Sequence, residues 1–154
     1  MSNIAQMVNV LQAMIITDKD KMLLTPTYHA FHMYKPFQDA ASLPTTIAYN
    51  TTYKSGDISV PGVSASAARA KDGKVYLALV NTNPGQPVDV NVDVNGSTIT
   101  GAPGRVLTPE KMDAHNTFAA PEAIKPASYS AKATGGKLTL SLPAKSVVVV
   151  ALEG

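Results

Sequence analysis

Four valines alternate with aspartate and asparagine in the stretch VDVNVDVNG, residues 88–96. Successive side chains of a β-strand point to opposite faces of a sheet, so this alternation predicts a strand with one apolar and one solvated face. The Asn-Gly pair at residues 95–96 is a hairpin signature, because both residues tolerate a positive φ. We therefore expect residues 88–94 to pair with a return strand over residues 97–100.

The same alternation extends in both directions from this stretch, but only after about residue 40. The apolar run at residues 146–152 predicts a central strand that is buried on both faces. Asp72-Gly73 and Gly135-Gly136 are expected hairpin turns. Short strands with frequent turns favour a mainly β fold, an antiparallel jelly-roll-like β-sandwich. The other expected strands are residues 45–53, 63–70, 74–81, 104–107 and 138–142, and residues 108–136 are expected to form a long loop.

The first 40 residues show a helical period instead. Apolar side chains recur there at spacings of three and four, which places them on one face of a helix. A second helix is expected from Pro26 to about residue 34, because Thr25 can cap it and proline suits its first position. We divide the chain into a short helical segment, residues 1–40, and a sandwich domain, residues 41–154. The apolar stripe of the first helix comprises Ile4, Met7, Val8, Leu11, Met14 and Ile15.

This stripe needs a protein surface to cover it. Burying a large apolar side chain contributes roughly 1.5–3 kcal/mol, so leaving all of them exposed would forfeit a free energy comparable with the stability of a domain. A short helix pair is not stable alone, because most helical stability comes from packing. The partner is either the sandwich itself or protein outside these residues, a second copy included.

The composition argues against several classes of function. Charged residues make up 16% of the chain, with a formal net charge of +2 and no basic block. Neither nucleic acid nor an anionic membrane is therefore an expected partner. The chain has no Cys, which excludes disulfides and thiolate metal sites. No secretory signal pattern is seen, and the apolar run at residues 13–16 is too short to span a bilayer. A soluble bacterial protein, cytoplasmic or secreted, agrees with these features.

Two motifs near the first residue are the most specific of the chain: NIAQMVNVLQ at residues 3–12 and TPTYHAFHMY at residues 25–34. Weaker motifs follow as GRVLT at 104–108, HNT at 115–117, IKP at 124–126 and LPAKSVVVV at 142–150. In this order the motifs resemble the C-terminal part of the α-L-arabinofuranosidases of glycoside hydrolase family 51. The resemblance implies that residues 1–40 end a (β/α)8 catalytic barrel and that the C-terminal sandwich follows.

The resemblance also implies a parent enzyme that removes terminal arabinofuranosyl groups from arabinan and arabinoxylan with retention of configuration. Retention needs two carboxyl groups about 5–5.5 Å apart, and the family carries its two glutamates on earlier barrel strands. Glu110, Glu122 and Glu153 do not lie in a family catalytic motif, so no catalytic residue is expected and this chain alone should be inactive. The missing barrel becomes the expected partner of the stripe, and the parent is expected to be a homo-oligomer, as family 51 enzymes tend to be.

Gln6 matches the glutamine of the Asn-Ile-Ala-Gln motif, which in the family reaches sugar hydroxyls from the end of the last barrel strand. An amide both donates and accepts hydrogen bonds, so it can bridge neighbouring hydroxyls. We expect Gln6 to bind substrate only in the full-length enzyme. The alternative is a polar residue on the exposed side of the first helix.

Two further hypotheses concern the sandwich itself. Tyr49 and Tyr53 lie four residues apart on an expected strand and so share a face, where they either form a platform for carbohydrate or pack into the core. A free-standing module that binds arabinose-containing polysaccharide, and a purely structural or oligomerisation domain, are therefore alternatives to an enzyme fragment. His29 and His32 share a helix face, but a third ligand is not evident, so no metal site is expected. No Gly-rich phosphate loop is present, and no cofactor is expected.

Overall fold

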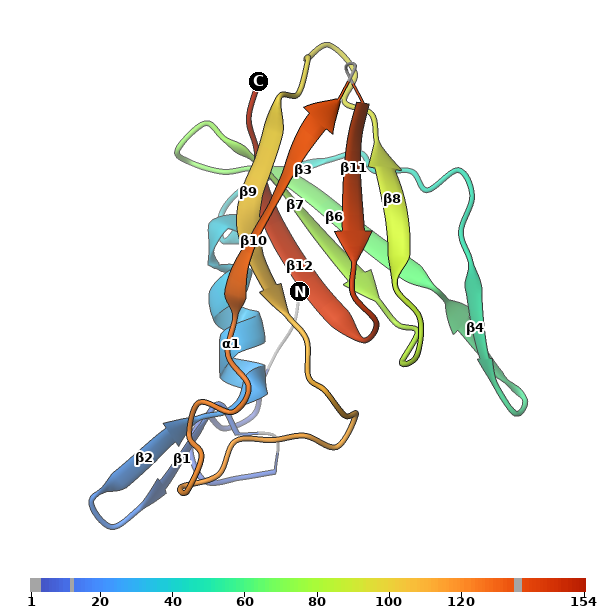
Figure 1. Cartoon of the computed structure of the whole chain (residues 1–154). Helices are drawn as coiled ribbons and strands as arrows, with labels where there is room; N and C mark the ends of the chain where they lie inside the picture. Colours follow the sequence, from blue (N-terminus) through green and yellow to red (C-terminus); the bar gives the residue numbers. More distant parts are fainter. Residues whose placement is uncertain (1–3, 12, 135–136) are drawn as a thin grey trace.

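The computed structural model describes residues 4–11, 13–134 and 137–154. These residues form a β-rich body with the helix α1 (Pro26–Met33) and the short 3-10 helix η1 (Lys35–Phe37) on one side (Figure 1). No helix in this described part is long and apolar enough to cross a bilayer. The strands are β1 (Ile15–Asp18), β2 (Lys21–Leu24), β3 (Ala41–Leu43), β4 (Thr52–Ser55), β5 (Ile58–Pro61), β6 (Val63–Arg69), β7 (Val75–Asn81), β8 (Val88–Val92), β9 (Gly101–Leu107), β10 (Ala127–Thr134), β11 (Lys137–Leu142) and β12 (Ser146–Leu152).

The main sheet has the strand order β3-β6-β7-β12-β9-β10-β11-β8, and its neighbours pair antiparallel. The sheet curls, so that β11 and β8 face β7 and β12 across an apolar interior (Figure 1). This arrangement confirms the expected antiparallel sandwich. Strand β12 lies between β7 and β9 and has buried valines on both of its faces, which confirms the interpretation of the apolar run.

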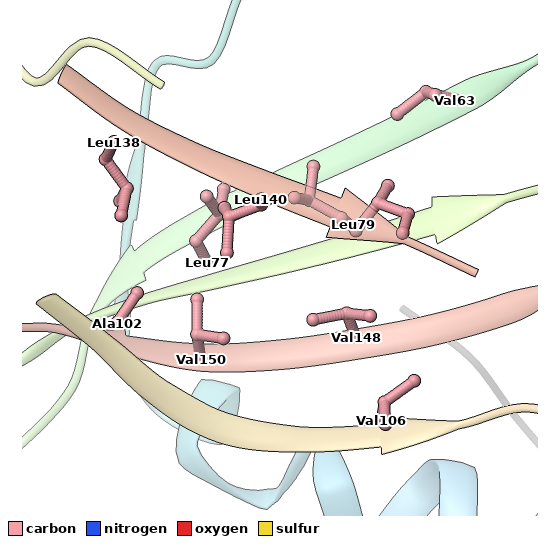
Figure 2. Packing of buried hydrophobic residues seen from close by; sticks show 10 residues of the cluster. Val63, Leu77, Leu79, Ala102, Val106, Leu138, Leu140, Val148 and Val150 are labelled. Atoms are coloured by element: carbon pink, nitrogen blue, oxygen red, sulfur yellow. The ribbon is translucent and has the colours of Figure 1, made fainter. Parts of the chain in front are cut away.

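The interior of the sandwich is filled by the apolar faces of strands that are distant in sequence. Figure 2 shows Leu138 and Leu140 of β11 above Leu77 of β7 and Val150 of β12. Alternation along β11 buries every second residue, because the intervening side chains point to solvent. Burial of each leucine contributes roughly 1.5–3 kcal/mol, so this interface is the main source of stability.

Helix α1 covers the opposite face of the central strands. Met33 of the helix packs in one cluster with Ala78 of β7 and Val149 of β12. The helix begins as expected, since Thr25 has extended backbone and its side chain accepts a hydrogen bond from the Tyr28 N–H, with proline in the first turn. The helix therefore shares a core with the sandwich, and the division of the chain at residue 40 stays a prediction.

The expected first helix is wrong. Residues 4–11 and 13–14 are irregular, and the hairpin of β1 and β2 follows them. Asn9, inside the expected helix, has a positive φ of 54°, which no α-helix accommodates. β-branched residues in the stretch favour extended backbone, and the apparent helical spacing arises from one loop followed by one strand.

Three assignments in the sandwich also differ from expectation. Residues 97–100 do not form the return strand of a hairpin: the turn at Gly96 exists, with φ at 81°, but β8 pairs with β11 instead. Residues 127–134 form β10 rather than loop, because their alternating alanine and serine residues gave a weak strand signal. Strand β4 begins only at Thr52, and it pairs with β5 in a separate hairpin. The expected turn at residues 135–136 lies outside the described residues.

Candidate functional site

Gln6 lies in the irregular segment and its side chain is exposed. Just beyond it, the backbone runs beside β1: the Ile15 N–H donates to the Met7 carbonyl at 3.0 Å, and the Asn9 N–H donates to the Ile15 carbonyl at 3.1 Å. The Asn9 amide donates to Thr17 Oγ1 at 2.9 Å and accepts from the Thr17 N–H at 2.7 Å. Asn9 thus holds the segment that carries Gln6 against the hairpin. Sequence reasoning missed this role, although asparagine is a common residue at positive φ.

A second asparagine fastens the hairpin to the body. Asn116 is 5% exposed, and its amide donates to the Leu24 carbonyl at 2.8 Å and to the Ile124 carbonyl at 2.9 Å. Its Oδ1 accepts from the Ile124 N–H at 2.7 Å. Thr25 adds a hydrogen bond to the Ala13 carbonyl at 2.7 Å. These contacts join β2, α1 and the loop before β10, which lie together at one end of the molecule (Figure 1).

Large apolar side chains are exposed at this same end. Met7, Val8, Leu11 and Met22, which we call the N-terminal patch, are 59%, 45%, 94% and 62% exposed. Scattered exposed apolar residues are normal, but several of them on one short segment mark an interaction surface. Of the expected stripe, Ile4, Met14 and Ile15 are half-buried. The described part of the chain therefore covers the stripe only in part.

A hollow of about 970 Å³, lined by both polar and apolar side chains, lies beside α1 over the outer face of the sheet. Tyr28 and His32 line it from the helix, with their rings stacked at 5.8 Å between centroids. Two ion pairs lie at its rim: Lys71 with Asp39 at 3.0 Å, and Lys125 with Glu122 at 2.8 Å.

Three titratable side chains that line the hollow, those of His29, Asp72 and Tyr76, have pKa values shifted by their surroundings. Partial burial lowers the pKa of His29, and the neighbouring His32 lowers it further, while Glu122 raises it. The backbone N–H of Lys74 lowers the pKa of Asp72, and the Tyr76 hydroxyl, which donates to Asp72 at 2.9 Å, lowers it as well. The same hydrogen bond raises the pKa of Tyr76, because ionisation of the phenol would remove the donor.

The other candidate residues do not come together as a site. Tyr49 is 98% exposed and precedes β4, whereas Tyr53 is half-buried within that strand, so the expectation that they share a strand face is wrong. The Glu122 carboxylate forms an ion pair with Lys125, and the backbone of Glu153 forms an isolated antiparallel β-bridge with that of Gly101. Within the described residues, no group of three His, Asp or Glu side chains is placed to hold a metal ion.

Comparison with known proteins gives one consistent match. A family model described as the α-L-arabinofuranosidase C-terminal domain matches residues 1–146. An intracellular exo-α-L-arabinofuranosidase from Bacteroides ovatus is 38% identical over 154 residues, which are 99% of this chain and 30% of that protein. The chain thus spans less than a third of the length of this curated relative.

Solved structures agree with this match. The family 51 arabinofuranosidase from Xanthomonas axonopodis pv. citri is 46% identical with a TM-score of 0.91, covering 99% of this chain and 31% of that one. The thermostable family 51 α-L-arabinofuranosidase from Thermotoga petrophila RKU-1 is 26% identical with a TM-score of 0.76, covering 97% and 33%.

Proposed function

This chain belongs to the α-L-arabinofuranosidase C-terminal domain family, and we propose that it serves a parent enzyme that removes terminal arabinofuranosyl groups from arabinan and arabinoxylan with retention. The relatives are much longer than the chain, which implies a catalytic part beyond these residues. The catalytic carboxylates belong to that part in this proposal. The present chain supplies the accessory sandwich.

The exposed N-terminal patch is the observation that carries the proposal. The sandwich encloses its own core, yet Leu11 remains almost fully exposed and Met22 largely exposed. Covering each such side chain would contribute roughly 1.5–3 kcal/mol. The missing catalytic part is the occupant we propose for the patch, with Ile4, Met14 and Ile15 extending it at the edge. Self-association through the same patch is the competing reading.

Gln6 is the substrate-binding residue in this proposal. It precedes Met7 of the patch directly, so docking of the patch brings its amide to the catalytic part. Its own segment is pinned by Asn9, and a pinned segment loses less conformational entropy on binding sugar. The support is the position and exposure of Gln6 together with the motif.

A graft tests the proposal. These residues would replace the matched C-terminal segment of the Xanthomonas enzyme, and hydrolysis of 4-nitrophenyl α-L-arabinofuranoside would be measured. We expect an active graft and an inactive isolated chain. Gln6→Ala in the graft should lower kcat/KM about two- to tenfold, since a neutral hydrogen bond contributes about 0.5–1.5 kcal/mol. Gln86→Ala, an exposed glutamine at the turn before β8, is the matched control. Equal effects of the two variants would remove Gln6 from the site, and robust turnover by the isolated chain would overturn the fragment reading.

A sugar-binding role of the sandwich is a second candidate, favoured by the fully exposed ring of Tyr49. Sugar faces stack on such rings. The half-buried position of Tyr53 provides no second ring for a planar platform, so the enzyme-accessory role is the better supported of the two.

A further inference from the structure

We propose that the hollow beside α1 receives an acidic segment of the parent's catalytic part. The inference rests on the proposed function and concerns a surface distinct from the N-terminal patch. Arg105 and Lys35 meet the incoming carboxylates.

Strand register shows why the outer face of the sheet is left open here. Val149 of β12 lies opposite both Ala78 of β7 and Arg105 of β9, so these side chains share the face that α1 covers. Val149 and Ala78 are buried under the helix. The next residue of β12 on this face, Ala151, lies opposite Tyr76, and both residues line the hollow. The floor of the hollow therefore combines the small side chain of Ala151 with the ring of Tyr76.

The side chains that line the hollow include cations that form no ion pair within the described residues. Its acidic residues are satisfied internally: Asp39 and Glu122 form the two ion pairs, and Asp72 accepts from Tyr76 and from a backbone N–H. Arg105 and Lys35 also line the hollow. Neither of them forms an ion pair within the described part of the chain. A guanidinium beside an apolar floor suits a bidentate bond to a carboxylate.

The position of the hollow favours a protein segment as its occupant. The same helix α1 that walls the hollow is joined through Thr25 to the hairpin and the N-terminal patch. A catalytic part docked on the patch is thus brought to the helix. The hollow is wide and open, near the upper end of the volumes of small-ligand pockets, and suits a packed segment better than an enclosed ligand.

Lysine acetylation measures coverage of the hollow in the active graft and in the isolated chain. We expect acetylation of Lys35 to fall at least about fivefold in the graft, because the incoming segment excludes the reagent. Lys132, exposed on β10 and outside the hollow, is the control whose labelling should stay unchanged. The peptide-resolved extent of labelling is read by mass spectrometry.

Charge reversal at Arg105 tests whether the partner segment is negatively charged. Arg105→Glu should lower the melting temperature of the graft by at least about 2 °C, because like charges brought together across an interface are strongly destabilising, and leave that of the isolated chain unchanged. Lys132→Glu should change neither. Equal labelling of Lys35 in both proteins, or equal effects of Arg105→Glu on both, would overturn the inference while an active graft keeps the proposed function. Binding of free glucuronate to the intact graft that Arg105→Glu abolishes would also overturn it, since the hollow would then be a ligand site. An inactive graft would remove the proposed function, and this inference with it.

Discussion

Replacement of Asn116 by alanine should be among the most damaging single changes outside the sandwich core. The substitution removes three hydrogen bonds at 2.7–2.9 Å, two to carbonyls and one from the Ile124 N–H. Each net hydrogen bond contributes about 0.5–1.5 kcal/mol, and a buried donor left without a partner costs about 1–3 kcal/mol. We expect a loss of about 3 kcal/mol in the free energy of unfolding, which corresponds to roughly 6–12 °C in melting temperature for a chain of this size.

Urea unfolding followed by circular dichroism measures this loss. Asn91→Ala is the matched control, because the Asn91 side chain only accepts one exposed hydrogen bond within the described residues, from Thr139 Oγ1 at 2.8 Å. It should cost less than about 0.5 kcal/mol. Hydrogen exchange should also quicken in β2, since Asn116 holds the Leu24 carbonyl. If Asn116→Ala loses no more than the control, the interpretation of Asn116 as the clamp between hairpin and body is refuted.

Three further changes test other parts of the structure. Gly104→Ala should lower the free energy of unfolding, measured with urea, by at least about 3 kcal/mol, because its methyl group would lie 2.6 Å from the Val150 Cα, where the backbone cannot yield. Gly85→Ala is the control, since the nearest atom to its methyl group would be Asn83 Oδ1 at 3.8 Å. Equal losses in the two variants would contradict the interpretation that Gly104 is required by close packing. The pKa of His29 is lowered in the folded chain, so the unfolded chain takes up the proton first and stability falls as the pH drops through about 6.5. His29→Gln should therefore lose less melting temperature between pH 7.5 and 5 than the parent chain, and an unchanged loss would count against that assignment. Tyr49→Ala should leave retention on insoluble arabinoxylan unchanged; a clear decrease would instead support the sugar-binding alternative.

Sequence reasoning reached the parts of the fold that depend on local patterns. Alternation identified β7, β8 and β11, because a side chain's face in a strand is set by whether its position is odd or even, and a continuous apolar run identified β12. Thr25 and Pro26 marked the start of α1 through capping, which involves only neighbouring residues. The motif order indicated the family. Gln6 was singled out by that motif and remains a prediction as a site residue.

Other features depended on contacts between residues distant in sequence. The partner of β8 is β11, some fifty residues later, and no local signal distinguishes it from residues 97–100. The alanines and serines of β10 become a strand because β9 offers them an edge. Lys35 lies outside the quoted motifs, and Arg105 falls within GRVLT without a role assigned to it there, since the hollow that the two residues line exists only once α1 lies on the sheet.

The amino-acid sequence by itself determined the sandwich class, the buried strand at residues 146–152 and the family, because alternation, apolar runs and motifs are properties of neighbouring residues. Tertiary structure alone decided that residues 4–11 and 13–14 are irregular, held by Asn9 and Thr17, rather than helical. The physical reason is that spacings of three and four satisfy a helix in isolation, whereas hydrogen bonds to β1 are available only when the hairpin is already in place.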